Sequence, residues 1–176
     1  WTKHKPKGNF QPGARKGHRA IPHEKFLVIF GGELANGEKD NSVFQLNTEN
    51  MAWSKAHVLG QPPSPRAFHS MCLLKDNTMA AVFGGLESPM NSEKIHTLQD
   101  LHLLDLRDMH WSAPFCGGQL PSSRYLHTMV SGNFTDRPDL FVLGGMDAQF
   151  CNMEFFKLKE NTGSDENPFG HDEDSA

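Results

Sequence analysis

Short apolar runs separated by polar or glycine-rich turns recur along the chain from residue 26 to residue 158. In the middle of the chain these runs are His69–Leu74, Met79–Phe83 and Leu101–Leu106, and Trp111 follows after one more turn. Each run has the length of a β-strand, and no segment shows the helical period of about 3.6 residues. The pattern therefore predicts an all-β chain of short strands and excludes a helical solenoid.

The same order of runs precedes and follows this middle unit. The earlier unit has the runs Phe26–Phe30 and Val43–Leu46 and then Trp53. The later unit has the runs Leu140–Leu143 and Phe155–Leu158, with no tryptophan after them. We therefore expect four strands in each of the first two units and three strands in the last.

A sequence block marks the start of each unit. Gly60–Met71 returns almost letter for letter as Gly118–Met129, and both contain Gly-Gln-x-Pro-x-x-Arg-x-x-His. A looser copy upstream has Pro12, Arg15 and His18 in the corresponding places. The consecutive arginines of these blocks are 51 and 58 residues apart. The chain is therefore a tandem repeat of units of about 50 residues.

Three further features recur once in each unit. The glycine pairs are Gly31-Gly32, Gly84-Gly85 and Gly144-Gly145, the tryptophans are Trp1, Trp53 and Trp111, and the histidines are His18, His69 and His127. Because glycine lacks a Cβ atom, we expect each pair to lie where a neighbouring backbone comes close. The tryptophan supplies apolar area for packing one sheet on the next, and truncating such a buried ring typically costs ~3–5 kcal/mol.

The order of Arg-x-x-His, apolar strand, glycine pair, apolar strand and tryptophan resembles the kelch motif. The resemblance extends from Trp1 to Leu158, and the long units are most similar to kelch proteins of the host cell factor, Rab9-effector and acyl-CoA-binding types. It implies an all-β fold, a partial kelch β-propeller of about three four-stranded antiparallel blades. No BTB or F-box segment accompanies the repeats.

The repeat register predicts how the chain divides. We expect residues 1–14 to hold the fourth strand of a preceding or closing blade and a basic linker, because Trp1 aligns with Trp53. The remaining boundaries are 15–65 for blade 1, 66–123 for blade 2, 124–160 for blade 3 without its last strand, and 161–176 for an acidic disordered tail. Two accounts fit this register: a fragment of a longer propeller, which we favour, or two chains forming a six-bladed ring. Either account leaves open blade edges that favour self-association.

Composition narrows the functional classes. The formal net charge is −4, so nothing global indicates nucleic-acid binding, and no apolar run is long enough to cross a membrane. Three scattered cysteines without Cys-x-x-Cys spacing are typical of a reducing compartment. We therefore expect cytoplasmic localisation, with the nucleus as the alternative, and no cofactor.

The recurring arginines Arg15, Arg66 and Arg124 allow two interpretations. The first, slightly favoured, is a structural ion pair or hydrogen bond to a turn of the neighbouring blade. The second comes from the resemblance, because in some kelch propellers the matching arginine lines the pocket for an acidic partner. The histidines recur once in each blade and are therefore interpreted as part of the framework, with metal binding far less favoured.

Loops of variable length on a constant frame are where propellers present partner-specific surface. The longest, Leu86–Gln99, contains Glu87, Met90, Asn91 and Lys94, and Glu33–Lys39 is its counterpart in the first unit. An insertion without a specific role is an equal alternative.

We expect a non-catalytic interaction module, a scaffold or adaptor that binds another protein through these loops and the recurring arginines. The sequence contains no catalytic motif for a nucleophilic serine, a phosphate loop or a zinc hydrolase. The alternatives are a fragment of a kelch-propeller enzyme whose catalytic residues lie in other blades, and a structural subunit that pairs through its open edge.

Overall fold

The fold is described from a computed structural model that covers residues 1–8, 10–74, 77–88, 94–132, 139–147, 151 and 154–158. Within these ranges the secondary structure consists of strands, with no helix. The expected all-β fold is confirmed. No helix in the described part of the chain is long and apolar enough to cross a bilayer.

The first blade is a four-stranded antiparallel sheet in the order β2-β3-β5-β6. Its strands are β2 (Arg19–His23), β3 (Phe26–Phe30), β5 (Val43–Asn47) and β6 (Ala52–Lys55). Phe30 pairs with Val43 and Leu46 pairs with Trp53, so the tryptophan lies on the last strand as expected.

The second blade has five strands rather than the expected four, in the order β7-β11-β10-β9-β8. They are β7 (Leu59–Gly60), β8 (Ser70–Leu73), β9 (Met79–Leu86), β10 (Thr97–Asp105) and β11 (His110–Ser112). The additional strand β7 belongs to the lead-in block and pairs parallel with β11. Lys7 makes the equivalent parallel bridge to Ala52 in blade 1.

The third blade contains three strands among the described residues, β12 (Thr128–Gly132), β13 (Asp139–Leu143) and β14 (Phe155–Leu158). They pair antiparallel in the order β12-β13-β14. A separate two-stranded antiparallel sheet of β1 (Arg15–Lys16) and β4 (Glu33–Leu34) lies beside blade 1.

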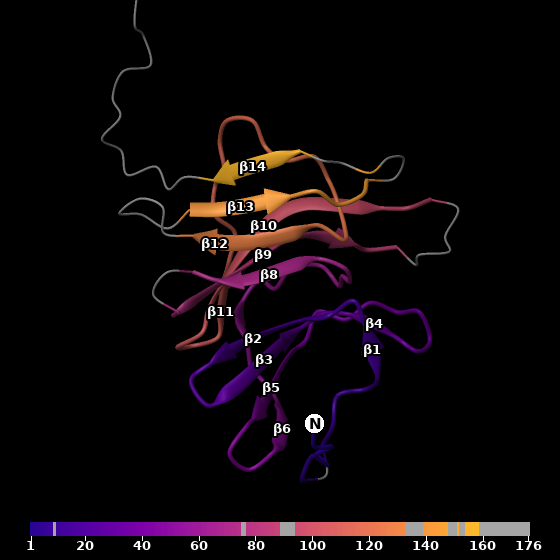
Figure 1. Cartoon of the computed structure of the whole chain (residues 1–176), viewed down its shortest axis with the longest axis vertical. Helices are drawn as coiled ribbons and strands as arrows, with labels where there is room; N and C mark the ends of the chain where they lie inside the picture. The colour runs from indigo at the N-terminus through magenta and orange to yellow at the C-terminus, as the bar shows by residue number, and fades with distance from the viewer. Residues whose placement is uncertain are drawn as a thin grey trace, which may run out of the picture.

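The three blades stack in sequence order along the long axis of the molecule (Figure 1). One core cluster joins blades 1 and 2, and in it the Trp111 ring, 2% exposed, lies 4.9 Å from the Phe30 ring of the preceding blade. A second cluster, with Phe83 and Met129 among its members, joins blades 2 and 3. Trp111 therefore seals its own blade against the previous one.

The glycine pairs lie at these blade interfaces. A Cβ atom on Gly84 would come within 2.7 Å of the carbonyl oxygen of Arg124 in the next blade, and one on Gly85 within 2.9 Å of His69 in its own blade. Both glycines have positive φ, +61° and +111°. The pair therefore has the role expected for it, since any side chain here would push two backbones apart.

One expectation differs from the structure. Residues 1–6 form no strand, and the Trp1 side chain is fully exposed, because none of the described strands lies beside it as a pairing partner. That Trp1 belongs to a neighbouring blade stays a prediction. The three cysteines form no disulfide bond, and Cys151 is exposed.

Candidate interaction site at the blade rim

The recurring arginines make the same contacts in every blade. Arg66 donates from Nε to the carbonyl of Ser64, from Nη1 to the carbonyl of Gly84 at 3.1 Å, and from both Nη atoms to the carboxylate of Asp100 at 2.7 Å. Arg124 makes the same kinds of contact, but donates to its acid from Nη2 alone. The corresponding carbonyl and acidic partners are Gly31 and Asp40 for Arg15, and Gly144 and Glu154 for Arg124.

These ion pairs connect segments of a single blade that are 25 to 34 residues apart in the sequence. The side chains of Arg66 and Arg124 are fully buried, while Asp100 and Glu154 stay 41% and 56% exposed. Burial opposes ionisation of Asp100, but hydrogen bonds from His102 and Arg66 outweigh it and hold the pKa of this carboxyl below its ordinary value. The structural interpretation expected a partner in the neighbouring blade, whereas the acid lies in the same blade.

Direct contact of Arg15, Arg66 and Arg124 with a partner protein stays a prediction. Each guanidinium group already has a carboxylate and a carbonyl partner, and a ligand would have to displace them. The backbone of Arg66 joins it to the preceding blade, because Gly32 N–H donates to the Arg66 carbonyl at 2.8 Å. Arg66 thus connects segments of its own blade through its side chain and two blades through its main chain.

The recurring histidines lie at the interfaces between blades. The rings of His69 and Phe30 meet edge to face at 5.2 Å, and those of His127 and Phe83 at 5.3 Å. Burial, reinforced by the charge of Arg66, lowers the pKa of His69 to about 3, and burial lowers the pKa of His127 to about 4. In the described ranges no group of three or more acidic, histidine or cysteine side chains is arranged to hold a metal ion.

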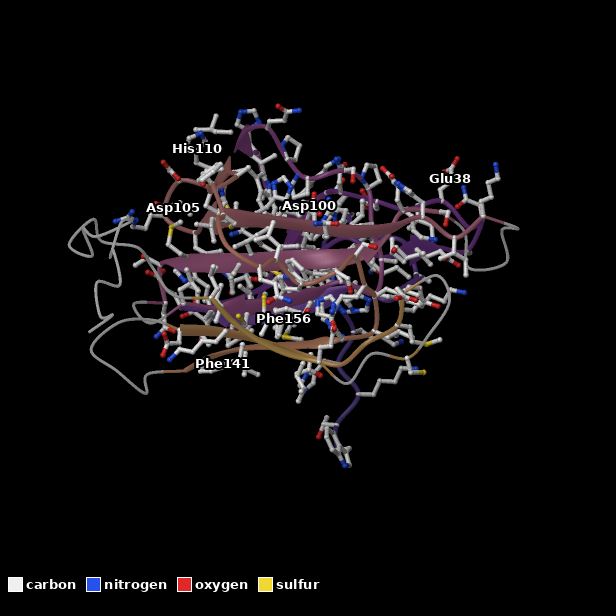
Figure 2. All side chains as sticks on the ribbon, turned by 90° about the horizontal axis from the view of Figure 1, so that it is seen from above. Glu38, Asp100, Asp105, His110, Phe141 and Phe156 are labelled. Carbon is white, nitrogen blue, oxygen red and sulfur yellow. The ribbon has the colours of Figure 1, made fainter. Side chains whose placement is uncertain are left out.

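The predicted rim loops do come together. A hollow with a volume of about 990 Å³ is lined by residues 14–16 and 33–39 of blade 1 and by Glu87 of blade 2. We call this the rim hollow. Its outer wall is the turn after β4, where Gly37 N–H donates to the carbonyl of Leu34 and Asn36 Nδ2 donates to Glu38 Oε2 at 2.8 Å. Figure 2 shows Glu38 at the edge of the molecule, opposite Asp105 and His110.

Ion pairs fix the side chains at the base of the rim hollow. Glu33 is buried and accepts from Lys16 Nζ at 2.8 Å and from Lys39 Nζ, whose side chain is 3% exposed. Burial opposes ionisation of Glu33, but these two ammonium groups outweigh it and lower the pKa of its carboxyl. On the far side Glu87 Oε2 lies 2.7 Å from Nδ1 of exposed His96. The lining of the hollow therefore contains charges of both signs.

The structure describes only some of the predicted loop residues, and one of these lines the rim hollow. Glu87 lines the rim hollow and Lys94 is exposed, whereas Met90 and Asn91 lie outside the described residues. The loop is shorter than expected, because β10 begins at Thr97, which pairs with Leu86.

Sequence reasoning missed the acids that pair with the arginines. Asp100 and Glu154 each directly precede the third apolar run of their unit, and Asp40 lies three residues before Val43 in the first unit. An acid that recurs shortly before this apolar run in every unit was the signal that could have identified them. It also missed Lys39, whose buried ammonium group pairs with Glu33, because a lysine in a polar loop is normally solvated.

Comparison with known proteins agrees with this geometry. A family model for the KLHDC2/KLHL20/DRC7 Kelch-repeats domain matches residues 1–167. The chain belongs to the kelch-repeat family. The kelch motif expected from the sequence is thus confirmed, and the stacked sheets are consistent with part of a β-propeller.

This kelch chain is similar in sequence to several known proteins. It is 34% identical over 125 residues to a Rab9 effector protein with kelch motifs from Mus musculus, covering 71% of this chain and 30% of the relative. It is 32% identical over 151 residues to acyl-CoA-binding domain-containing protein 4 of Arabidopsis thaliana, covering 86% and 21%. It is 32% identical over 111 residues to dynein regulatory complex subunit 7 of Chlamydomonas reinhardtii, covering 62% and 9%. The chain spans less than a third of the length of each relative.

Proposed function

We propose that this kelch chain is a non-catalytic interaction module that binds a partner protein through the rim hollow. The observation that carries the proposal is the meeting of loops from two blades around one concave surface, with Lys16, Glu38 and Glu87 at its edge. Loops on a rigid frame are where binding residues concentrate, since the frame holds them in place at little entropic cost.

The character of the rim hollow indicates the kind of partner. Its charged side chains have both signs, and Glu33 is already neutralised by two lysines. Such a surface suits a polypeptide segment with charges of both signs better than a nucleic acid or a single anion. The names of two relatives, an effector protein and a subunit of a regulatory complex, are consistent with a partner-binding role.

The test compares two double variants of the full chain. Glu38→Lys with Glu87→Lys reverses two carboxylates at the rim hollow. The control, Glu49→Lys with Asp108→Lys, makes the same charge change in the turns β5–β6 and β10–β11 at the opposite end of the blades. All four side chains lie outside the core clusters, so both proteins should fold.

Proteins retained by the native chain from a cell extract would be quantified by mass spectrometry against both variants. A partner engaged at the rim hollow should be lost from the rim variant and kept by the control, and the binding constant of that purified partner should fall at least tenfold. Equal retention by both variants would exclude the rim hollow as the site.

A further inference from the structure

A second hollow lies between blades 2 and 3, and it corresponds to the place that an indole fills one blade earlier. Its volume is about 380 Å³, and its lining is mostly apolar side chains. The core cluster around Trp111 contains Phe30, Val43, Met71, Ala80, Val82 and Leu104. By strand register the equivalent residues one blade on are Phe83, Leu101, Met129, Leu140, Val142 and Leu158, and all six line the hollow.

The residues that follow β14 in the sequence do not place an aromatic residue opposite Leu158, where the hollow would receive it. Trp53 follows Leu46 by seven residues, Trp111 follows Leu104 by seven, and Asp165 follows Leu158 by seven. A carboxylate is a poor occupant of an apolar hollow, because burying an unpaired charge is costly. The strand that fits must pair with β14 and carry a tryptophan opposite Leu158.

The first residues of the chain have these properties. Trp1-Thr2-Lys3 resembles Trp53-Ser54-Lys55, and the Trp1 ring is fully exposed. Six residues after Trp1, Lys7 bridges to Ala52, just as Leu59 bridges to His110 six residues after Trp53. In the second case the tryptophan lies on the last strand of the preceding blade. By the same geometry, Trp1 is placed to enter a blade that precedes blade 1.

The forward face of blade 3 also has the character of a blade interface. Val130 of β12 and Leu143 of β13 are each about half exposed on it, at 50% and 49%. Phe83, which is equivalent to Leu143, is only 4% exposed because blade 3 covers it. Large apolar side chains exposed at a position that is buried one blade earlier are typical of an interaction surface.

We propose that a second copy of this chain covers this face and inserts its Trp1 into the hollow. Its residues 1–3 would pair antiparallel with β14 in the register Trp1 opposite Leu158, Thr2 opposite Lys157 and Lys3 opposite Phe156, as β6 and β11 do in their blades. Charge favours this direction, since residues 1–7 carry three lysines and no acid, whereas residues 159–176 carry six acids and one lysine.

The contact is head-to-tail, and such contacts form a closed ring when the rotation permits. Two copies carry six blades together, within the range of about four to eight found in propellers. The proposal therefore predicts a dimer with two equivalent contacts rather than an open polymer. It depends on the fold alone and is independent of binding at the rim hollow.

The test measures the mass of the full chain by light scattering as its concentration is raised to several hundred micromolar. We expect the mass to rise from 19.7 kDa to twice that value. Trp1→Ala should weaken dimerisation at least tenfold without affecting folding, since the ring contacts no core cluster. The matched control is Leu59→Ala, an exposed apolar residue outside the lining, which should dimerise like the native chain.

Amine cross-linking tests the register. Lys3 and Lys157 lie at opposite ends of one molecule, as the N-terminus and β14 do in Figure 1, so a cross-link between them must join two copies. A mixture of isotope-labelled and unlabelled chains should yield this cross-link as a mixed pair. A chain that stays monomeric, a dimer that survives Trp1→Ala, or a dimer without the Lys3–Lys157 cross-link would each overturn the proposal.

Discussion

The three tryptophans occupy equivalent places in successive units but differ in burial, and they therefore form a graded test of the packing argument. Trp111 is 2% exposed, Trp53 is half-buried and Trp1 is fully exposed. We predict that Trp111→Ala lowers the free energy of unfolding by ~3–5 kcal/mol. Trp53→Ala should lower it by on the order of 1–2 kcal/mol. Trp1→Ala should change it by less than about 0.5 kcal/mol in the monomer.

The cost expected for Trp111→Ala is a large fraction of the whole stability of a domain, which is about 5–15 kcal/mol. Trp111→Ala should therefore remove a large part of the margin by which the first two blades stay folded together. The measurement is urea unfolding followed by far-ultraviolet circular dichroism, because each substitution removes a fluorescent reporter. Dilute protein keeps any association through Trp1 from contributing.

A further variant separates ring packing from the indole N–H. Trp111 Nε1 has no hydrogen-bond partner among the described residues, so Trp111→Phe removes a buried, unsatisfied donor while it keeps an aromatic ring against Phe30. It should cost clearly less than Trp111→Ala. If Trp111→Ala destabilises no more than Trp1→Ala, the indole does not hold the blades together and the reasoning fails.

Three other outcomes follow from the interfaces. Gly85→Ala should lower the thermal unfolding temperature more than Gly118→Ala. Both glycines have positive φ, but only Gly85 has neighbouring atoms within 3 Å of a new Cβ. Equal shifts in unfolding temperature would contradict this. Arg66→Lys should lower the midpoint of urea unfolding, since a lysine cannot reproduce the bonds of the buried guanidinium group to the carboxylate and carbonyl groups. An unchanged midpoint would mean that the positive charge alone is sufficient. Stability should fall as pH drops below about 6.5, because His69 and His127 take up protons in the unfolded chain but, with pKa values of about 3 and about 4, stay neutral when folded. The slope is about 1.4 kcal/mol per histidine per pH unit down to about pH 4, and a flat profile from pH 6.5 to 5 would refute it.

Local repetition made most of the fold predictable. Strand order, the glycine pairs and the position of Trp111 all follow from residues close together in the chain, since a strand and its turns are defined by alternation and by backbone freedom. The parallel pairing of β7 with β11 was not predictable in this way, because it joins segments about 50 residues apart and only two residues of each strand take part.

The candidate site was predictable only in part. The sequence indicated loops that include Glu33–Lys39 and Glu87, and these do meet around the rim hollow. It left the role of Arg66 open between a partner pocket and the frame. The recurrence of one acid in every unit could have indicated Asp100 as a candidate, but its pairing with Arg66 depends on which segments lie side by side in space.

The repeating unit and its register follow from local patterns, because apolar alternation, glycine pairs and tryptophans each act over a few residues. Which of these repeated features are buried or paired depends on the packing of the blades. Trp111 is buried and Trp1 is exposed although both occupy the same place in the unit, since an indole is covered only where a neighbouring blade exists to receive it. Burial and ion pairing are properties of the neighbours in space, and no local pattern contains them.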